Sequence, residues 1–283
     1  MTGRQRERRH RRTGAAVVAA VLLAGAGLGT AGCSGGDAVA GDSRGGDAVV
    51  ALRKAADRLI GAGSSRARTS MEMAAGGTRV TIRGAGVYDY RKRMGRLKVH
   101  LPQDPAGAAE RRPITELLAP GALFMKNRGA GVPQDKWVRV DTRTLSDGNL
   151  VTGGATDPFT AAEVLLGTRT ATYVGRTEVA GTRVRHYRGT AHLGDAARRA
   201  SDGNKGPLKA AAEGFATAEV PFDAYLDDEG RIRKVRHRFS FLNGQQKRPV
   251  AVASTTLLYD FGAPVRVRLP RTDDIYAGKI TEE

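Results

Sequence analysis

The chain of 283 residues contains a single cysteine, which excludes a disulfide framework and a zinc site built from several thiolates. Aromatic residues make up only 5% of the sequence. Binding of single-stranded nucleic acid uses a basic groove with stacking aromatic side chains, so this composition argues against a nucleic-acid partner. The sequence also lacks the HExxH, phosphate-loop and GxSxG motifs of metalloproteases, nucleotide-binding proteins and serine hydrolases.

The histidines give no metal site either. His186 and His192 lie six residues apart in a predicted strand, and an extended chain would separate them by roughly 20 Å. Two side chains at that distance do not share one metal ion. We therefore predict no catalytic residues, no metal ligands and no cofactor.

Residues 1–32 have the pattern of an export signal. Arginines crowd the first twelve residues, and residues 14–32 carry no charge. Thr30-Ala31-Gly32 stand directly before Cys33 and resemble a bacterial lipobox, although Thr30 replaces the usual leucine. This resemblance implies that Cys33 is diacylated, becomes the new N-terminus and anchors the protein to the outer face of the cell membrane. A membrane-spanning helix, which needs roughly 20 apolar residues, is the alternative.

The formal net charge is +17 for the whole chain, and removing the +5 of residues 1–32 leaves +12. A basic residue near a membrane gains about 1 kcal/mol from anionic lipid headgroups. The basic residues are, however, dispersed along the chain rather than concentrated in one run. We therefore interpret most of them as the solvated outer face of a sheet.

Residues 33–46 are rich in glycine and small polar residues, which predicts a flexible tether after the lipidated cysteine. Residues 47–283 are predicted to form a single domain. Its first helix begins at Asp47, where apolar residues recur at spacings of three and four until Gly61 and Gly63 end the pattern.

A second helix is predicted at Asp157-Pro158. Asp157 suits the N-cap, and the fixed backbone angle of Pro158 suits the first helical position. Gly167 ends this helix. Residues 194–214 are polar, rich in alanine and interrupted by glycine and proline, so we expect a short helix and a mobile excursion there.

Alternating Thr, Val, Ile and aromatic residues between turn residues predict many strands. Asp227 to Gly230 predict a hairpin turn, and Ile232 is out of phase with Val235, which indicates a bulge or a change of buried face. The predicted strands cover residues 68–74, 78–88, 95–101, 122–126, 136–140, 170–177, 182–192, 220–227, 231–242, 250–259 and 265–269. Short connections predict antiparallel pairing. The predicted fold class is α+β, a strongly curved antiparallel β-sheet, or half-barrel, with helices packed across its concave face.

Three segments resemble the LppX/LprAFG-type lipoproteins of actinobacteria. Residues 156–190 hold an Asp-Pro-led helix and a hairpin ending in YRG, residues 220–241 hold a hairpin around AYLDDEGR, and residues 258–270 hold a final strand with Gly-Ala-Pro-Val. The resemblance covers most of residues 47–274. It implies a LolA-like fold, in which helices lie over an apolar cavity of a half-barrel, and a function in binding or carrying acylated lipids or glycolipids.

We therefore expect a monomeric envelope lipoprotein that binds or transports an acylated lipid or glycolipid in an apolar cavity. Burial of ten methylene groups would contribute about 8 kcal/mol before the costs of binding are subtracted. Ordinary core packing is the alternative for each residue expected at the cavity. The expected cavity-lining residues are Trp137, Val138, Phe159, Leu165, Leu166, Tyr225, Phe239, Phe241 and Leu257, and the expected basic residues of the cavity rim are Arg236 and Arg238.

Two other functions fit the sequence. The first is a lipid-sensing regulator with an envelope protein partner, like the RseB-type periplasmic proteins. The second is a cell-wall hydrolase whose active site follows none of the common motifs. Co-purification of a membrane protein without lipid would favour the regulator, and convergent carboxylates in a cleft would favour the hydrolase.

Overall fold

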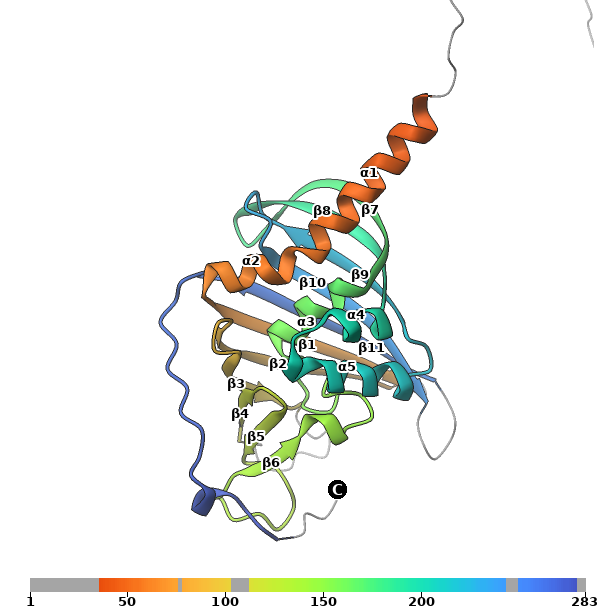
Figure 1. Ribbon diagram of the computed structural model, residues 1–283. Coiled ribbons are helices and arrows are strands. Elements are labelled where there is room, and N and C mark those ends of the chain that lie inside the picture. The colour runs from red at the N-terminus through yellow and green to blue at the C-terminus, as the bar shows by residue number, and fades with distance from the viewer. Residues whose placement is uncertain (1–35, 76–77, 103–111, 243–248, 279–283) are drawn as a thin grey trace, which may run out of the picture.

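The computed structural model describes residues 36–75, 78–102, 112–242 and 249–278, so Cys33 and the export signal lie outside the described residues (Figure 1). Eleven strands form one antiparallel sheet in the order β6-β5-β4-β3-β2-β1-β11-β10-β9-β8-β7. Strands that follow one another in the chain are neighbours in the sheet, except β6 and β7, which form its two edges; the pair of β1 and β11 joins the two halves. This meander confirms the predicted antiparallel fold.

The strands are β1 (Ser64–Ala75), β2 (Thr78–Asp89), β3 (Met94–His100), β4 (Ile114–Ala119), β5 (Ala122–Lys126), β6 (Val138–Asp141), β7 (Thr168–Val179), β8 (Thr182–His192), β9 (Glu219–Leu226), β10 (Ile232–Leu242) and β11 (Pro249–Tyr259). The helices are α1 (Gly36–Arg53), α2 (Ala55–Ala62), α3 (Pro158–Val164), α4 (Leu193–Arg199) and α5 (Asp202–Gly214). Short 3-10 turns are η1 (Thr142–Thr144), η2 (Leu165–Gly167) and η3 (Thr272–Asp274).

The sheet curves strongly, and α2 to α5 lie across its concave face (Figure 1). Glycine allows part of this curvature. A Cβ atom at Gly86 in β2 would lie 1.9 Å from the backbone oxygen of Arg96 in β3, a distance that no side chain tolerates. The half-barrel therefore depends on close backbone approach between β2 and β3.

The main hydrophobic core lies between the concave face and the helices. In β9, Phe222, Ala224 and Leu226 point into this core, and Leu52 and Leu59 reach it from α1 and α2. A smaller apolar cluster around Leu117, Ala122 and Phe124 lies apart from the main core. Strand β4 contributes to both clusters.

Most elements lie where the sequence predicts them, and β5 and β8 have the predicted bounds. The turn at Asp227 to Gly230 joins β9 to β10, and the sheet register shifts between Ile232 and Lys234, which confirms the bulge. Strand β4 was not predicted. Residues 265–269, predicted as a strand, are not part of the sheet; the chain there runs past its edge before Ile275 pairs with Trp137.

Two further expectations differ from the structure. The segment 194–214 is not a mobile excursion but two helices, α4 and α5, because Leu193, Ala196, Leu208 and Ala211 supply a buried face. Helix α1 begins at Gly36, so residues 36–46, which we assigned to a flexible tether, are helical in the structure. In α5, burial of the apolar face that includes Leu208 and Ala211 overrides the low helix propensity of the local sequence.

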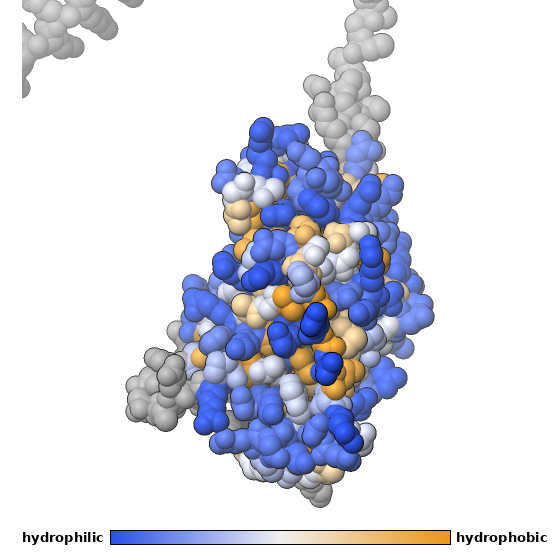
Figure 2. Space-filling view, turned by 90° about the vertical axis from the view of Figure 1, so that its left-hand side faces the viewer, coloured by the Kyte–Doolittle hydropathy of each residue, from blue (hydrophilic) through white to orange (hydrophobic). Residues whose placement is uncertain are grey.

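The surface is mainly hydrophilic. Figure 2 shows the side of the molecule along which the chain runs after β11, where apolar residues gather in the middle and hydrophilic residues surround them. Within the described parts of the chain, no helix combines the length and the apolar character needed to cross a membrane.

Candidate functional site

The concave face of the sheet is the candidate binding surface. Residues that pair directly in an antiparallel sheet point to the same face, so the register shows which side chains lie together. One line of such residues crosses the concave face from β6 to β11: Val138, Met125, Glu116, Leu97, Gly86, Ala67 and Leu258. All seven are apolar or glycine except Glu116. The concave face is therefore an apolar surface with isolated polar groups.

Helix α3 begins on this surface with the predicted N-cap. The carboxylate of Asp157 accepts hydrogen bonds from the backbone N–H groups of Phe159 at 2.7 Å and Thr160 at 2.9 Å. Burial raises the pKa of Asp157 to about 6, although these N–H groups oppose the rise. The cap turns Phe159 into the interior, where its ring centroid lies 6.2 Å from that of Tyr90.

Helix α5 is attached to α3 by polar contacts. The carboxylate of Glu163 in α3 accepts hydrogen bonds from the backbone N–H of Ser201 at 2.8 Å and from Nδ2 of Asn204 at 2.5 Å. Glu163 is 3% exposed. The buried side chains of α5 are Pro207, Leu208 and Ala211, and Ala212 packs half-buried against the core, so a short apolar face and this polar attachment together hold α5.

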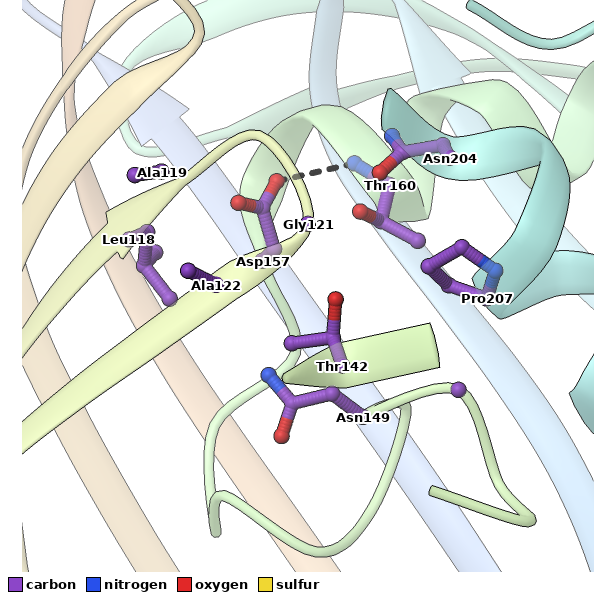
Figure 3. Close-up of a pocket in the computed structure, with 11 residues that line it drawn as sticks. Leu118, Ala119, Gly121, Ala122, Thr142, Asn149, Asp157, Thr160, Asn204 and Pro207 are labelled. Carbon is purple, nitrogen blue, oxygen red and sulfur yellow. Dashed lines mark hydrogen bonds between the residues drawn. The ribbon is translucent and has the colours of Figure 1, made fainter. Parts of the chain in front are cut away.

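The interior is filled by side chains in this structure. Phe159 is 1% exposed and Leu165 is 0% exposed, and both lie in the main core. A crevice between the β4–β5 turn, α3 and α5 has a volume of about 20 Å³, which is room for one water molecule (Figure 3). In Figure 3, Asp157 and Thr160 come from the start of α3, and Asn204 and Pro207 come from α5. Entry of a ligand therefore requires the helices to move.

Several buried polar atoms of the interior lack a hydrogen-bond partner among the residues that the structure describes. They include both carboxylate oxygens of Glu116, Oδ1 of Asn149, Nε2 of His237, and the hydroxyls of Thr69 and Thr256. Burial raises the pKa of Glu116 to about 8 and lowers the pKa of His237 to about 3, so both side chains are held in their neutral forms. Leaving such groups unpaired costs about 1–3 kcal/mol each.

The outer, convex face carries a charged network centred on Asp223 in β9. The carboxylate accepts hydrogen bonds from Nε2 of His186 at 2.8 Å, Nε of Arg188 at 3.0 Å and a guanidinium nitrogen of Arg238 at 2.7 Å. Burial by itself would raise the pKa of Asp223, but these donors overcome it and lower the pKa to about 2. Tyr225 stacks on His186 with ring centroids 4.3 Å apart.

The convex face also has a shallow apolar hollow of about 350 Å³. Ser70, Ala85 and Thr255 supply small side chains, and Leu257 lines the hollow as well. These residues pair across β1, β2 and β11 on the side opposite to the core residues Thr69 and Thr256. It is an apolar hollow on the face opposite to the main core.

The predicted site residues do not all lie together. Val138, Phe159, Leu165 and Phe239 are buried in the main core, and Leu166 and Phe241 pack against it half-buried. Trp137 packs instead against the smaller cluster beside Ile275.

Four assignments to the cavity or its rim were wrong. Tyr225 and Leu257 lie on the convex face, because they pair with His186 and Arg68 on that side. Arg236 and Arg238 also lie there: Arg236 pairs with Glu72 at 3.4 Å, and Arg238 pairs with Asp223. Arg236 and Arg238 alternate along β10 with the buried residues His237 and Phe239, so both arginine side chains point away from the interior.

The sequence did not point to Glu116 or Glu163, which are buried acidic residues of the interior. Glu116 shares a strand phase with Ile114 and Leu118, which is a signal for a buried carboxyl once β4 is recognised as a strand. Among the described residues, no group of three or more His, Cys, Asp or Glu side chains could hold a metal ion.

No protein-family model matches the sequence, and no curated protein matches it. The fold is similar to the crystal structure of the lipoprotein LppX from Mycobacterium tuberculosis, with 9% identity, 79% of this chain and 99% of that chain covered, and a TM-score of 0.48. It is also similar to LprF from Mycobacterium bovis, with 13% identity, 80% of this chain and 97% of that chain covered, and a TM-score of 0.41. A third similar structure is the LolA superfamily protein NE2245 from Nitrosomonas europaea, with 13% identity, 75% of this chain and 94% of that chain covered, and a TM-score of 0.33. Each likeness is one of fold alone.

Proposed function

We propose that the protein is an exported lipoprotein, anchored to the membrane through Cys33, that binds the acyl chains of a lipid between the concave face and helices α3 to α5. The observation that carries this proposal is an apolar concave face covered by helices, of which α5 contributes a short buried face. This role requires no catalytic residue or cofactor. The concave face supplies the apolar surface, and α5 supplies a cover that can be displaced.

The apolar part of an exchange of α5 for an acyl chain is favourable. Burial of a leucine contributes about 1.5–3 kcal/mol and burial of a methyl group contributes about 0.8 kcal/mol, so Leu208 and Ala211 together contribute roughly 2–4 kcal/mol. Ten methylene groups of a lipid contribute about 8 kcal/mol. Helix α5 also includes Gly203, Gly206 and Pro207, which lower its intrinsic helix stability. The acyl chain therefore offsets the apolar contact of Leu208 and Ala211, and it must also offset the hydrogen bonds that Glu163 loses when α5 moves.

The test is lipid extraction from the full chain purified out of bacterial membranes, followed by mass spectrometry. Thr255 and Thr256 are neighbours in β11 that point to opposite faces, so Thr256→Phe fills the interior and Thr255→Phe fills the convex hollow. We expect wild-type protein and Thr255→Phe to carry about one acylated lipid per chain, and Thr256→Phe to carry much less while it still melts cooperatively. Overpacking costs about 1–3 kcal/mol. Absence of lipid from the wild type, or its loss only in Thr255→Phe, would contradict the proposal.

A further inference from the structure

The convex face of the sheet brings together basic residues that are dispersed along the sequence. Residues that pair across neighbouring strands point to the same face, and so do residues two apart on one strand. Two adjacent rows of such residues cross the convex face from β3 to β10. The first row is Lys98, Ala85, Arg68, Leu257 and Lys234, and the second row is His100, Arg83, Ser70, Thr255 and Arg236. Five of these ten residues are Arg or Lys and none is acidic, so the two rows are strongly basic.

Most of these positive charges are not neutralised within the described part of the chain. Arg236 forms an ion pair with Glu72, with an N···O distance of 3.4 Å. The carboxylate of Asp223, which pairs with Arg236 across the sheet, already accepts three hydrogen bonds. The Arg and Lys residues of the two rows that form no ion pair with a described carboxylate are Arg68, Arg83, Lys98 and Lys234. The two rows therefore attract negatively charged groups.

The apolar hollow of about 350 Å³ lies between these basic side chains. Ser70, Ala85 and Thr255 line it with small side chains, and Arg68 and Arg83 line it as well. An arginine side chain reaches well beyond a small side chain, so the small residues form a floor and the arginines form a rim. An apolar floor is unfavourable in water and becomes favourable when a partner covers it. The hollow therefore suits a partner that carries an apolar group between negative charges.

This shape favours a protein segment over a membrane or a charged polymer. A surface that inserts into a bilayer presents projecting apolar side chains, whereas the apolar floor of the hollow is recessed below its rim. A polymer that carries only negative charges would contact the rim and leave the floor in water. A protein segment can place acidic residues on both sides of one apolar side chain, so it complements the rim and the floor together. An apolar anchor in a pocket with polar groups around it is the usual arrangement at protein interfaces.

We propose that the hollow between Arg68, Arg83 and Arg236 binds an acidic segment of a partner protein. The carboxylates of the segment pair with the basic rim, and one of its apolar side chains covers Ser70 and Thr255 in the floor. The hollow lies on the face opposite to the helices, so a segment bound there leaves α3 to α5 free to move (Figure 1). The inference goes beyond the proposed function and does not depend on it.

The test measures the binding of three fluorescein-labelled peptides to the full chain by fluorescence anisotropy. Cys33→Ser is present throughout, so that no detergent is needed that would compete for the hollow. The peptide GEELEEG has glutamates on both sides of one leucine, GQQLQQG lacks the charges, and GEESEEG lacks the apolar side chain. We expect GEELEEG to bind about tenfold more tightly than either of the others, because both the ion pairs and the buried leucine contribute. Raising the NaCl concentration from about 0.05 M to about 0.5 M should weaken its binding.

One pair of substitutions tests the rim. Arg83→Gln combined with Lys98→Gln should weaken the binding of GEELEEG about tenfold, because two of its ion pairs are lost. The matched control is Arg199→Gln combined with Lys209→Gln, which removes the same charge from exposed residues of α4 and α5 on the other side of the sheet. This control should change the affinity by less than about twofold.

Another pair of substitutions tests the floor. Thr255→Phe fills the hollow, so it should reduce the binding of GEELEEG to that of GEESEEG. Thr256→Phe adds the same volume to the neighbouring residue of β11, whose side chain points into the interior, and it should leave the binding of GEELEEG unchanged.

Equal binding of GEELEEG and GEESEEG by the chain with Cys33→Ser alone, or equal effects of the two pairs of glutamine substitutions, would overturn the inference. Binding to phosphatidylglycerol vesicles that depends on Arg83 and Lys98, without binding of GEELEEG, would also overturn it, because the face would then belong to a membrane. These outcomes are separate from the proposed function. A chain that carries lipid and binds no peptide contradicts only this inference, and a chain that binds GEELEEG and carries no lipid contradicts only the proposed function.

Discussion

Arg238 of β10 donates a hydrogen bond to the carboxylate of Asp223 in β9, and the two atoms are 2.7 Å apart. This contact joins two strands on the convex face, where His186 and Arg188 of β8 reach the same carboxylate. One acidic side chain thus links three neighbouring strands. The basic residues that we had expected at the rim of a cavity instead hold the outer surface of the half-barrel together.

Asp223→Asn should therefore destabilise the protein. Asp223 is 5% exposed and accepts three charge-assisted hydrogen bonds, so we expect the free energy of unfolding to fall by about 2 kcal/mol. Chemical denaturation of wild type and variant measures this change. The matched control is Asp260→Asn, which removes the exposed ion pair with Arg66 and should change stability by less than about 0.5 kcal/mol. Equal effects of the two substitutions would show that the network contributes no more than an ordinary surface pair.

Glu116 should make stability depend on pH. Its pKa is raised to about 8 in the folded protein, above the ordinary value of 4.5, so folding favours the protonated form. The stabilisation is complete below about pH 4.5 and is lost as the pH rises towards 8. Asp157 contributes in the same direction at lower pH, because its pKa is raised to about 6. We expect Glu116→Gln to flatten the decline in unfolding free energy between pH 6 and pH 8.

Denaturant unfolding of both proteins across that pH range checks this prediction. His237, whose pKa is lowered by burial to about 3, opposes the trend only under acidic conditions, where the folded protein must keep it neutral. An identical slope for wild type and Glu116→Gln between pH 6 and pH 8 would mean that Glu116 does not titrate in that range.

The anchor makes a separate prediction. Two acyl chains hold a protein on a membrane far more stably than one, so a diacylated Cys33 would give a lasting attachment. Cys33→Ser should abolish incorporation of a radiolabelled fatty acid and should shift the protein from the membrane fraction to the soluble fraction. Labelling that persists in Cys33→Ser would place the lipid elsewhere and reject the lipobox assignment.

The order of helices and strands can be predicted from local sequence signals. Which face of a strand is buried cannot be predicted in this way for several strands. Asp157 and Pro158 predict the start of α3 because capping is a local interaction. Strand β4 was missed because Leu117 and Leu118 are buried on opposite faces in two different clusters, which removes the alternation of polar and apolar residues.

The candidate site was harder to predict for the same reason. On β9, the consecutive residues Phe222, Asp223 and Ala224 are all buried, so buried residues occur on both faces of the strand. Tyr225 was therefore assigned to the concave face, although it lies on the convex face. The alternation in β10 does place Arg236 and Arg238 opposite Phe239, and the ion pairs with Glu72 and Asp223 then fix them on the outer surface. Such pairs join residues far apart in sequence and appear only in the folded chain.

The most direct test of an acyl site under the helices is photo-crosslinking with a palmitate analogue that carries a diazirine at the end of its chain. The full-length protein is irradiated with the probe, digested and sequenced by mass spectrometry. We predict labels on Phe159, Leu165 or Phe239, which face the interior, and their loss when excess unlabelled palmitate competes. Labels confined to the convex hollow around Arg83 and Leu257, or labels that unlabelled palmitate does not remove, would contradict the account.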